Sequence, residues 1–142
     1  MKIKSFRGLI ADGAIDTISL HTNTGSTGYK INKFQIIGPD SNENIESTVK
    51  VYKIKQTTID DKIDFSDNTL LAAATFSGTT SSANTAAQVV VFDNEIFNQD
   101  IYVTHTTTDG SGAVNYYIEL EQIRLDLNEN TVATLKDIRN LS

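Results

Sequence analysis

Apolar residues recur along this chain in short runs that are separated by Gly, Asn, Asp and Ser. The runs begin about ten residues apart, as expected of strands joined by turns. Eight segments qualify as strands: Ile3–Phe6, Ala14–Leu20, Tyr29–Ile37, Thr48–Lys55, Leu70–Phe76, Gln88–Phe92, Ile101–Thr107 and Val114–Leu125. The pattern predicts an all-β protein, an antiparallel β-sandwich or jelly roll of about eight strands.

Two of these segments contain a change in the parity of their apolar positions. In Val114–Leu125, alternation places Tyr116, Ile118 and Leu120 on the inner face, and the apolar set changes parity after Leu120. The segment Tyr29–Ile37 shows the same change between its first and second halves. Each change predicts a β-bulge, or a bend between sheets, that absorbs one residue.

Three connections read as loops rather than core. Ser77–Ala86 contains no residue larger than Asn or Thr and has little apolar surface to offset its ordering entropy, so we expect an exposed loop. Pro39–Glu46 contains the only proline and predicts a turn, and His21–Gly28 is rich in Gly and Thr.

The C-terminal segment has a different period. Its apolar residues are three positions apart and fall near one helical face: Val132, Leu135, Ile138 and Leu141. We therefore expect a β-sandwich domain over residues 1–127 and a short helical or extended arm over residues 128–142. A helix this short is marginal alone in water. The arm packs either on its own domain or on a neighbouring subunit, and the sequence leaves both open.

The composition changes the picture in three respects. Ser, Thr and Asn occupy 41 of the 142 positions, which indicates a polar surface, while 39% hydrophobic and 21% charged residues are ordinary for a folded domain. The absence of Cys excludes disulfides. Met1–Ile10 lacks the apolar run of a signal peptide or membrane span, so we expect a protein that is made and kept soluble, with no membrane partner.

The formal net charge of −6 disfavours nucleic acid as a partner, because affinity for phosphates comes from Lys and Arg. The basic residues nevertheless form two clusters, Lys2, Lys4 and Arg7 at the start and Lys50, Lys53 and Lys55 in one segment. We interpret both clusters as solvated strand edges. A patch that follows phosphates is the alternative.

Residues suited to catalysis are scarce. His21 and His105 each sit in a Thr-rich stretch without a second ligand or base at a useful spacing, so we expect surface or strand-edge side chains. Gly25–Lys30 echoes a phosphate loop with the wrong spacing. A hydrolase would need a polar triad that neither histidine supplies. The sequence therefore predicts no enzyme, no catalytic residue and no cofactor.

Acidic residues invite a metal interpretation at two places. Asp60, Asp61, Asp64 and Asp67 are close in sequence, and Asp40–Glu46 begins like a calcium loop. The second stretch lacks the glycine and the distal glutamate of such a loop. We interpret both stretches as solvated loop carboxylates and predict no metal site.

Three stretches carry a resemblance that extends over most of the chain. They are IKQTTIDDKIDFSDNTLLAAATF from Ile54, VVVFDNEIFNQDIYVT from Val89 and NYYIELEQIRLDLNENTVATLKDIRN from Asn115. In these stretches the chain resembles a group of small virion proteins of marine tailed bacteriophages. The resemblance implies a structural component of the particle, such as a head decoration or cement protein with a β-sandwich body. Such a protein is synthesised in the host cytoplasm and resides in the virion.

A particle protein of this kind binds through repeated weak contacts. Its expected partners are the major capsid protein or another virion protein, together with other copies of itself, and a trimer is slightly favoured over a dimer on lattice symmetry alone. The candidate exposed anchors lie at both ends of the chain: Phe6, Leu9 and Ile10, then Val132, Leu135, Ile138 and Leu141.

A recognition module is the alternative from another functional class. It would be a neck-associated, tail-associated or receptor-binding sandwich that recognises a glycan or protein on the host surface. The loops His21–Gly28 and Ser77–Ala86 would supply hydroxyl and amide groups, and Tyr29, Tyr116 and Tyr117 could supply stacking faces. Core or cross-strand roles are the competing interpretation of these tyrosines.

Overall fold

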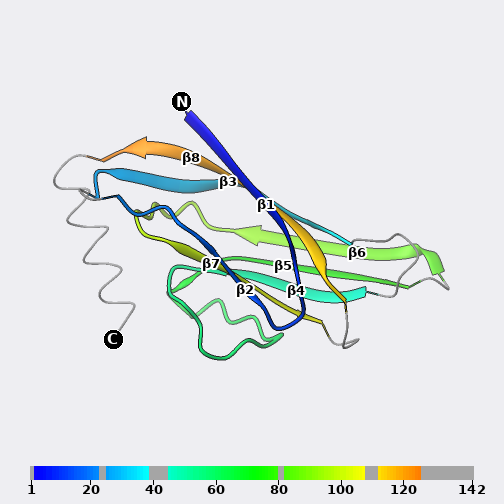
Figure 1. Cartoon of the computed structure of the whole chain (residues 1–142). Coiled ribbons are helices and arrows are strands. Elements are labelled where there is room, and N and C mark those ends of the chain that lie inside the picture. Colours follow the sequence, from blue (N-terminus) through cyan, green and yellow to red (C-terminus); the bar gives the residue numbers. More distant parts are fainter. Residues whose placement is uncertain (1, 23–24, 39–44, 80–81, 108–111, 126–142) are drawn as a thin grey trace.

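In the part of the chain that the structure describes, eight antiparallel strands form two sheets that lie face to face (Figure 1). The computed structural model describes residues 2–22, 25–38, 45–79, 82–107 and 112–125. The strands are β1 (Lys2–Ile10), β2 (Ile15–Ile18), β3 (Thr27–Ile37), β4 (Ile45–Tyr52), β5 (Leu70–Thr79), β6 (Ser82–Phe92), β7 (Ile101–Thr107) and β8 (Val114–Arg124). They follow the order of the eight predicted segments, and the predicted antiparallel β-sandwich is confirmed.

The two sheets differ in width. One has three strands in the order β1-β8-β3, and the other has five in the order β2-β7-β4-β5-β6. Within the wider sheet, β4, β5 and β6 are sequential neighbours and β7 returns beside β4, which is a Greek key. Because β1 and β8 lie in one sheet while β2 and β7 lie in the other, the crossings from β1 to β2 and from β7 to β8 occur at the same end of the sandwich.

The core lies between the facing sides of the sheets. On β8, the inward residues Val114, Ile118 and Leu120 are all fully buried. They meet a layer of small and branched residues from the wider sheet, including Val49, Val51, Ala72, Ala74 and Val103. Period-two alternation along each strand therefore builds one continuous apolar layer, as the sequence pattern predicts.

One of the two predicted irregularities is present. The pairing of β3 with β8 shifts register between Ile31 and Lys33, so β3 carries a bulge at Asn32. The bulge returns Phe34 and Ile36 to the inner face, where each is 1% exposed.

The irregularity predicted in β8 is wrong. This strand pairs residue by residue with β1 and β3 from Val114 to Arg124, and the only shift lies on the β3 side. Leu125, just after the end of the strand, is 5% exposed but lies outside the main core cluster. Leu125 and Ile96 lie close to Gly28, where an added Cβ would come within 3.1 Å of Leu125 and 3.0 Å of Ile96.

The loop predicted at Ser77–Ala86 is also wrong. β5 extends to Thr79 and β6 begins at Ser82, so most of this stretch forms the arms of a long hairpin. Ser77 pairs with Ala87 and Thr79 with Ser82, and the register shifts between these two pairs.

Polar side chains also join the two sheets. The hydroxyl of Tyr116 on β8 donates to Asp16 Oδ2 on β2 at 2.9 Å, and Gln88 Nε2 on β6 donates to the carbonyl of Ile36 on β3 at 2.7 Å. Burial raises the pKa of Tyr116, and the hydrogen bond to Asp16 raises it further. The Tyr116 ring needs a glycine opposite it, because a Cβ at Gly8 would lie 3.1 Å from the ring.

His105 makes a third connection between the sheets. It is fully buried, with Nδ1 3.0 Å from the carbonyl of Ile10 and Nε2 3.0 Å from Ser47 Oγ. Because a carbonyl can only accept, Nδ1 carries the proton and Nε2 accepts from Ser47, which describes a neutral imidazole. Burial lowers the pKa of His105, although nearby backbone groups and Asp12 oppose the change. The expected surface position of His105 is therefore wrong.

Residues 53–69, called here the 53–69 loop, join β4 to β5 and lie against the outer face of the five-stranded sheet (Figure 1). Beneath the loop, the Lys50 side chain is 3% exposed, and its Nζ donates to Asp60 Oδ1 at 2.9 Å and to the Lys62 carbonyl at 2.6 Å. Burial alone would lower the pKa of Lys50, but Asp60 and Tyr52 raise it overall. Lys50 therefore ties the loop to the sheet.

Lys53 is buried in a similar way. Its Nζ lies 2.8 Å from Glu95 Oε1, and the two side chains are 3% and 12% exposed. The interpretation of Lys50 and Lys53 as solvated strand-edge residues is therefore wrong, and neither is available to follow phosphates. The N-terminal cluster differs, because Lys2, Lys4 and Arg7 are exposed on β1.

Several sequence predictions lie outside the described residues. These are the arm at 128–142 and most of the Pro39–Glu46 turn. The domain boundary at 127 also stays a prediction. Among the described residues, no helix has the length and apolar character needed to cross a membrane.

The burial of His105 predicts a loss of stability in mild acid. The folded state holds the imidazole neutral, whereas the unfolded chain protonates it near pH 6.5. The free energy of unfolding should therefore decrease as the pH falls below about 6.5, by at most about 1.4 kcal/mol per pH unit. Urea denaturation at pH 7.5, 6.5, 5.5 and 5.0 measures this slope.

The variant His105→Gln should show a flatter dependence over the same range. His21→Gln is the matched control, because it removes the exposed imidazole and should leave the decrease in place. An equal slope in His105→Gln and the unsubstituted chain would contradict this assignment.

A second prediction concerns the anchor of the 53–69 loop. Asp60→Ala leaves the charge of Lys50 buried without its carboxylate, and we expect a cost of about 1–3 kcal/mol, because Asp60 itself is partly solvated. Lys50→Met combined with Asp60→Ala should recover most of that cost, since it removes the buried charge. Asp61→Ala, at an exposed neighbouring position, should change stability by less than about 0.5 kcal/mol. Chemical denaturation of the four proteins tests the expectation, and a double variant less stable than Asp60→Ala would refute it.

Candidate functional site

The predicted N-terminal anchors have three different environments on β1. Leu9 is 59% exposed, as expected of an anchor. Phe6 faces inward and packs partly buried against the core. Ile10 is 1% exposed and belongs to the core, so its expected exposure is wrong. The C-terminal anchors lie outside the described residues: Val132, Leu135, Ile138 and Leu141.

Leu9 belongs to a row of side chains that crosses the outer face of the three-stranded sheet. In this row Leu9 on β1 lies opposite Asn115 on β8, which lies opposite Ile37 on β3. Ile37 is 64% exposed. Because opposite residues of neighbouring strands point to the same face, Leu9 and Ile37 flank Asn115 on one surface.

The next row, Arg7, Tyr117 and Gln35, borders the first. Together the two rows line a shallow groove of about 510 Å³, called here the sheet-face groove. The Tyr117 ring is partly exposed in it, and Lys33 Nζ lies 5.7 Å from the ring centroid. The groove therefore combines two large apolar side chains with an aromatic ring and several hydrogen-bonding groups.

The next two rows of this outer face carry charged pairs between β3 and β8. They place Glu119 opposite Lys33 and Glu121 opposite Lys30, with 3.6 Å between Lys30 Nζ and Glu121 Oε2. Cross-strand pairs of opposite charge suit a solvated surface. The face thus has a solvated end and an apolar end, and the sheet-face groove lies at the apolar end.

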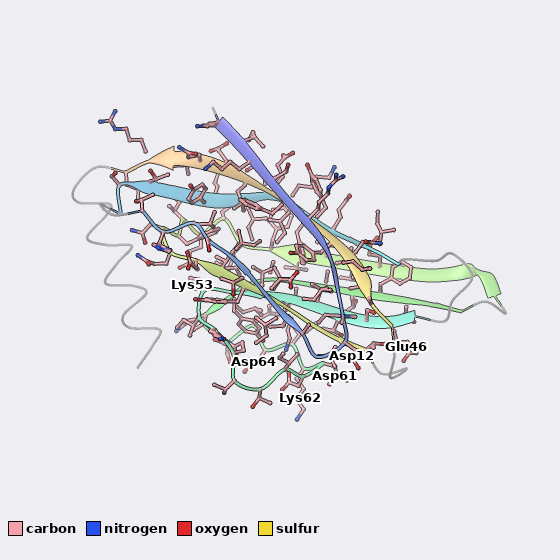
Figure 2. All side chains as sticks on the ribbon, viewed as in Figure 1. Asp12, Glu46, Lys53, Asp61, Lys62 and Asp64 are labelled. Atoms are coloured by element: carbon pink, nitrogen blue, oxygen red, sulfur yellow. The ribbon has the colours of Figure 1, made fainter. Side chains whose placement is uncertain are left out.

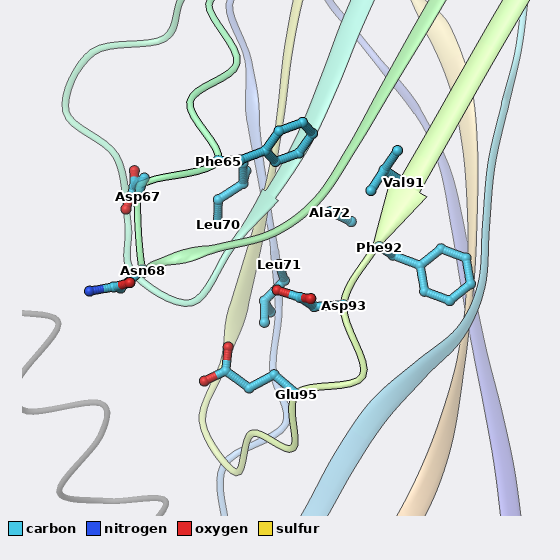
Figure 3. A pocket seen from close by; sticks show the side chains of 10 residues that line it. All are labelled: Phe65, Asp67, Asn68, Leu70, Leu71, Ala72, Val91, Phe92, Asp93 and Glu95. Atoms are coloured by element: carbon cyan, nitrogen blue, oxygen red, sulfur yellow. The ribbon is translucent and has the colours of Figure 1, made fainter.

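A second concave surface lies beside the edge of the five-stranded sheet. This pocket of about 210 Å³, called here the edge pocket, lies between the 53–69 loop and the ends of β5 and β6 (Figure 3). Phe65 from the loop is 70% exposed, and Val91 from β6 is 47% exposed. Asp67, Asp93 and Glu95 also line the pocket. Its lining is therefore mixed, with apolar side chains beside several acidic ones.

The acidic cluster of the 53–69 loop does not converge. Asp60 binds Lys50, Asp64 accepts from Ser66, and Asp67 accepts from Thr69. Asp61 and Asp64 lie along the outer side of the loop in Figure 2. Within the described residues, no group of three or more His, Cys, Asp or Glu side chains is arranged to hold a metal ion.

The carboxylates in this part of the chain serve local structure. The hydrogen bond from Lys50 lowers the pKa of Asp60, and the Ser66 hydroxyl and amide lower the pKa of Asp64. The stretch Asp40–Glu46 lies largely outside the described residues, so its resemblance to a calcium loop stays untested.

The histidines occupy contrasting positions. His21 is exposed, as predicted, with Nδ1 2.7 Å from Asp100 Oδ1. Burial would raise the pKa of Asp100, but the bonds from His21 and from the Leu20 amide lower it overall. His105 meets Ser47, a pairing that sequence spacing could not reveal because 58 positions separate them. Neither residue lines the sheet-face groove or the edge pocket.

The tyrosines considered for recognition are divided between core and surface. Tyr29 is 3% exposed and stacks on Phe97 with ring centroids 6.5 Å apart, and Tyr116 is 6% exposed. Both have the core roles that were the competing interpretation. Tyr116 and Tyr117 both line the sheet-face groove, and Tyr117 is the less buried of the two.

Comparison with known proteins places the chain in no family. No protein-family model matches it, and the search of curated proteins finds no match. Any function assigned to the chain therefore rests on its residues and on their arrangement.

Proposed function

We propose that this chain is a structural protein of a bacteriophage virion, most simply a capsid decoration or cement protein. In this role it binds the shell lattice through non-covalent contacts and acts by adhesion rather than catalysis. Its partners are the major capsid protein or another virion protein. The resemblance of its three longest distinctive stretches to small phage virion proteins supports this proposal.

The sheet-face groove is the observation that carries the proposal. Leu9 and Ile37 are 59% and 64% exposed on one row of a sheet face. Large apolar side chains that gather on an outer sheet face, bordered by polar residues, are typical of protein interfaces. The edge pocket adds a second concave surface of mixed polar and apolar character, bordered by the 53–69 loop and β6. A sandwich with two such surfaces suits a component that joins neighbours.

A recognition module of the neck or tail is the second candidate. The observation that favours it is also in the sheet-face groove, where the Tyr117 ring adjoins Asn115, Gln35 and Arg7. An aromatic face beside amide and guanidinium groups is suited to a glycan of the host surface.

Copy number separates the two candidates. Quantitative mass spectrometry of purified particles of a phage that encodes this chain gives its ratio to the major capsid protein. A decoration protein should approach the stoichiometry of the lattice, in hundreds of copies. A few copies per particle, with binding of the purified chain to host cells, would favour the recognition module. Absence from the particle would overturn both.

The groove proposal makes a prediction for incorporation into particles. Leu9→Thr combined with Ile37→Thr keeps side chains that suit strands but removes apolar surface worth about 1 kcal/mol at each position. We expect the affinity of a single docking site to fall on the order of ten- to a hundredfold. Binding of the variant to particles that lack the protein measures the effect.

Ile3→Thr is the matched control, because Ile3 is 41% exposed on the same strand and face, in the row of Lys30 and Glu121. It should bind like the unsubstituted chain. Equal binding by all three proteins, each with an unchanged thermal unfolding transition, would remove the groove from the proposal.

The C-terminal anchors make a separate prediction. A chain that ends at Asn128 lacks Val132, Leu135, Ile138 and Leu141, whereas the described core lies within residues 2–125. We expect this chain to fold and to be incorporated less well into particles. Unchanged incorporation would show that the arm makes no essential contact.

A further inference from the structure

The four edge strands of the sandwich differ in how they discourage pairing with another chain. An edge strand exposes unpaired N–H and C=O groups, and natural proteins protect such edges with charge, short length or bulges. β1 carries Lys2, Lys4 and Arg7, and β2 has only 4 residues. β3 contains a bulge and two lysines, and its Tyr29 also bridges to Phe97.

Within the described residues, the last part of β6, Gln88–Phe92, has none of these protections, because the register shift in its pairing with β5 lies before Ala87. β6 is an edge strand of 11 residues without a charged residue or a proline from Ser82 to Phe92. Its last part, Gln88–Phe92, includes three consecutive valines, of which Val89 and Val91 are 60% and 47% exposed. By the physics of sheet edges, this strand is suited to pair with another strand.

The backbone of β6 presents a regular set of groups to the open edge. Asp93 N donates to the Leu71 carbonyl at 3.0 Å, and the pairing continues with Val91 opposite Ala73. In an antiparallel ladder, alternate residues direct both backbone groups to the same neighbour. The groups of Val91 and Val89 therefore point to β5, and those of Phe92, Val90 and Gln88 point outward.

We propose that a second copy of this chain pairs with β6 about a two-fold axis at Val90, which joins two five-stranded sheets into one. In this antiparallel arrangement Val90 faces Val90 of the second copy, and Phe92 faces Gln88. These are the residues whose backbone groups point outward, so the pairing forms about six hydrogen bonds. A two-fold contact of this kind closes on itself.

The side chains agree with this register. Val89 of one copy faces Val91 of the other in a non-hydrogen-bonded pair, where side chains come closest. Both valines are on the outer face, and Phe65, which lines the edge pocket with Val91, adjoins the same seam. Pairing would cover the apolar surface of both copies at once.

The charges of the chain also permit a second copy at this edge, although each copy carries a formal net charge of −6. Three acidic residues, Asp67, Asp93 and Glu95, line the edge pocket beside this strand, and Glu95 is paired with Lys53. The nearest along the strand is Asp93, three positions from the axis. At 3.4 Å per residue the two copies of Asp93 are about 20 Å apart along the strands. Because the Debye length is about 8 Å at physiological salt, their repulsion is largely screened.

This dimer is independent of whether the protein belongs to a virion. It also replaces the slight preference for a trimer, which came from lattice symmetry and not from any residue of the chain.

Two double variants at the same positions test the proposal. Val89→Lys with Val91→Lys places like charges opposite each other at the seam, and we expect the dimer dissociation constant to rise on the order of a hundredfold. Val89→Lys with Val91→Glu places opposite charges there, because residue 89 of one copy faces residue 91 of the other. This variant should remain dimeric.

Sedimentation equilibrium over a concentration series into the high micromolar range measures the mass of each full-length protein. The unsubstituted chain should sediment at twice its 15.6 kDa. If the unsubstituted chain is a monomer at every concentration, a different partner binds the β6 edge and the proposal is overturned. A double-lysine variant that remains dimeric would also overturn it. So would equal dissociation constants for the two double variants, provided that circular dichroism shows both to be folded.

Cysteine cross-linking checks the register, since the sequence contains no Cys. A tagged Val89→Cys chain mixed with an untagged Val91→Cys chain should form a disulfide under mild oxidation, because the paired Cα atoms lie about 4.5 Å apart. Val89→Cys alone should not, because its two copies are about 8 Å apart. Cross-links in Val89→Cys alone at the efficiency of the mixture would refute the two-fold axis at Val90.

Discussion

The alternation of side chains along β8 is the constraint on which this structure depends. β8 is the central strand of the narrower sheet, and its inward residues Val114, Ile118 and Leu120 are completely buried. Both neighbours are held in register with it: β1 without interruption, and β3 by means of a bulge. The outward residues of β8 must then form the exposed face, which is how Asn115 and Tyr117 come to lie in the sheet-face groove.

Buried polar groups must find partners, and that requirement explains the residues most suited to chemistry. His105 in the core is neutral between the Ile10 carbonyl and Ser47, and Lys50 on the outer face of the wider sheet holds the 53–69 loop. A serine next to an imidazole is also the arrangement of a hydrolytic nucleophile and its base. Here the imidazole has no exposed surface, and a backbone carbonyl takes the place of the orienting carboxylate.

The sequence predicted the strands well because period two is a local property. It could not predict which side chains are buried by contacts between distant segments. Lys50 reads as a solvated lysine until the loop that follows covers it, and Ser47 meets His105 only after folding. The stretch Ser77–Ala86 misled for another reason, because small polar residues can extend the arms of a hairpin without the apolar alternation that marks a strand. Leu9 was predicted as an anchor, but Ile37 was missed, since only the register through Asn115 brings them to one face.

The two proposed interfaces use different physics, and together they explain how a small acidic protein could hold to a lattice. Pairing at β6 relies on directional backbone bonds, which fix one orientation but need a partner strand of matching register. The sheet-face groove offers apolar area with few directional groups, which tolerates some variation in what it meets. A dimer carries two grooves. Once the first groove is bound to the lattice, the second is held near its own docking site at a high effective concentration, if the spacing of the lattice matches that of the grooves. Weak docking at each groove would then be sufficient, because dissociation requires both to open at once.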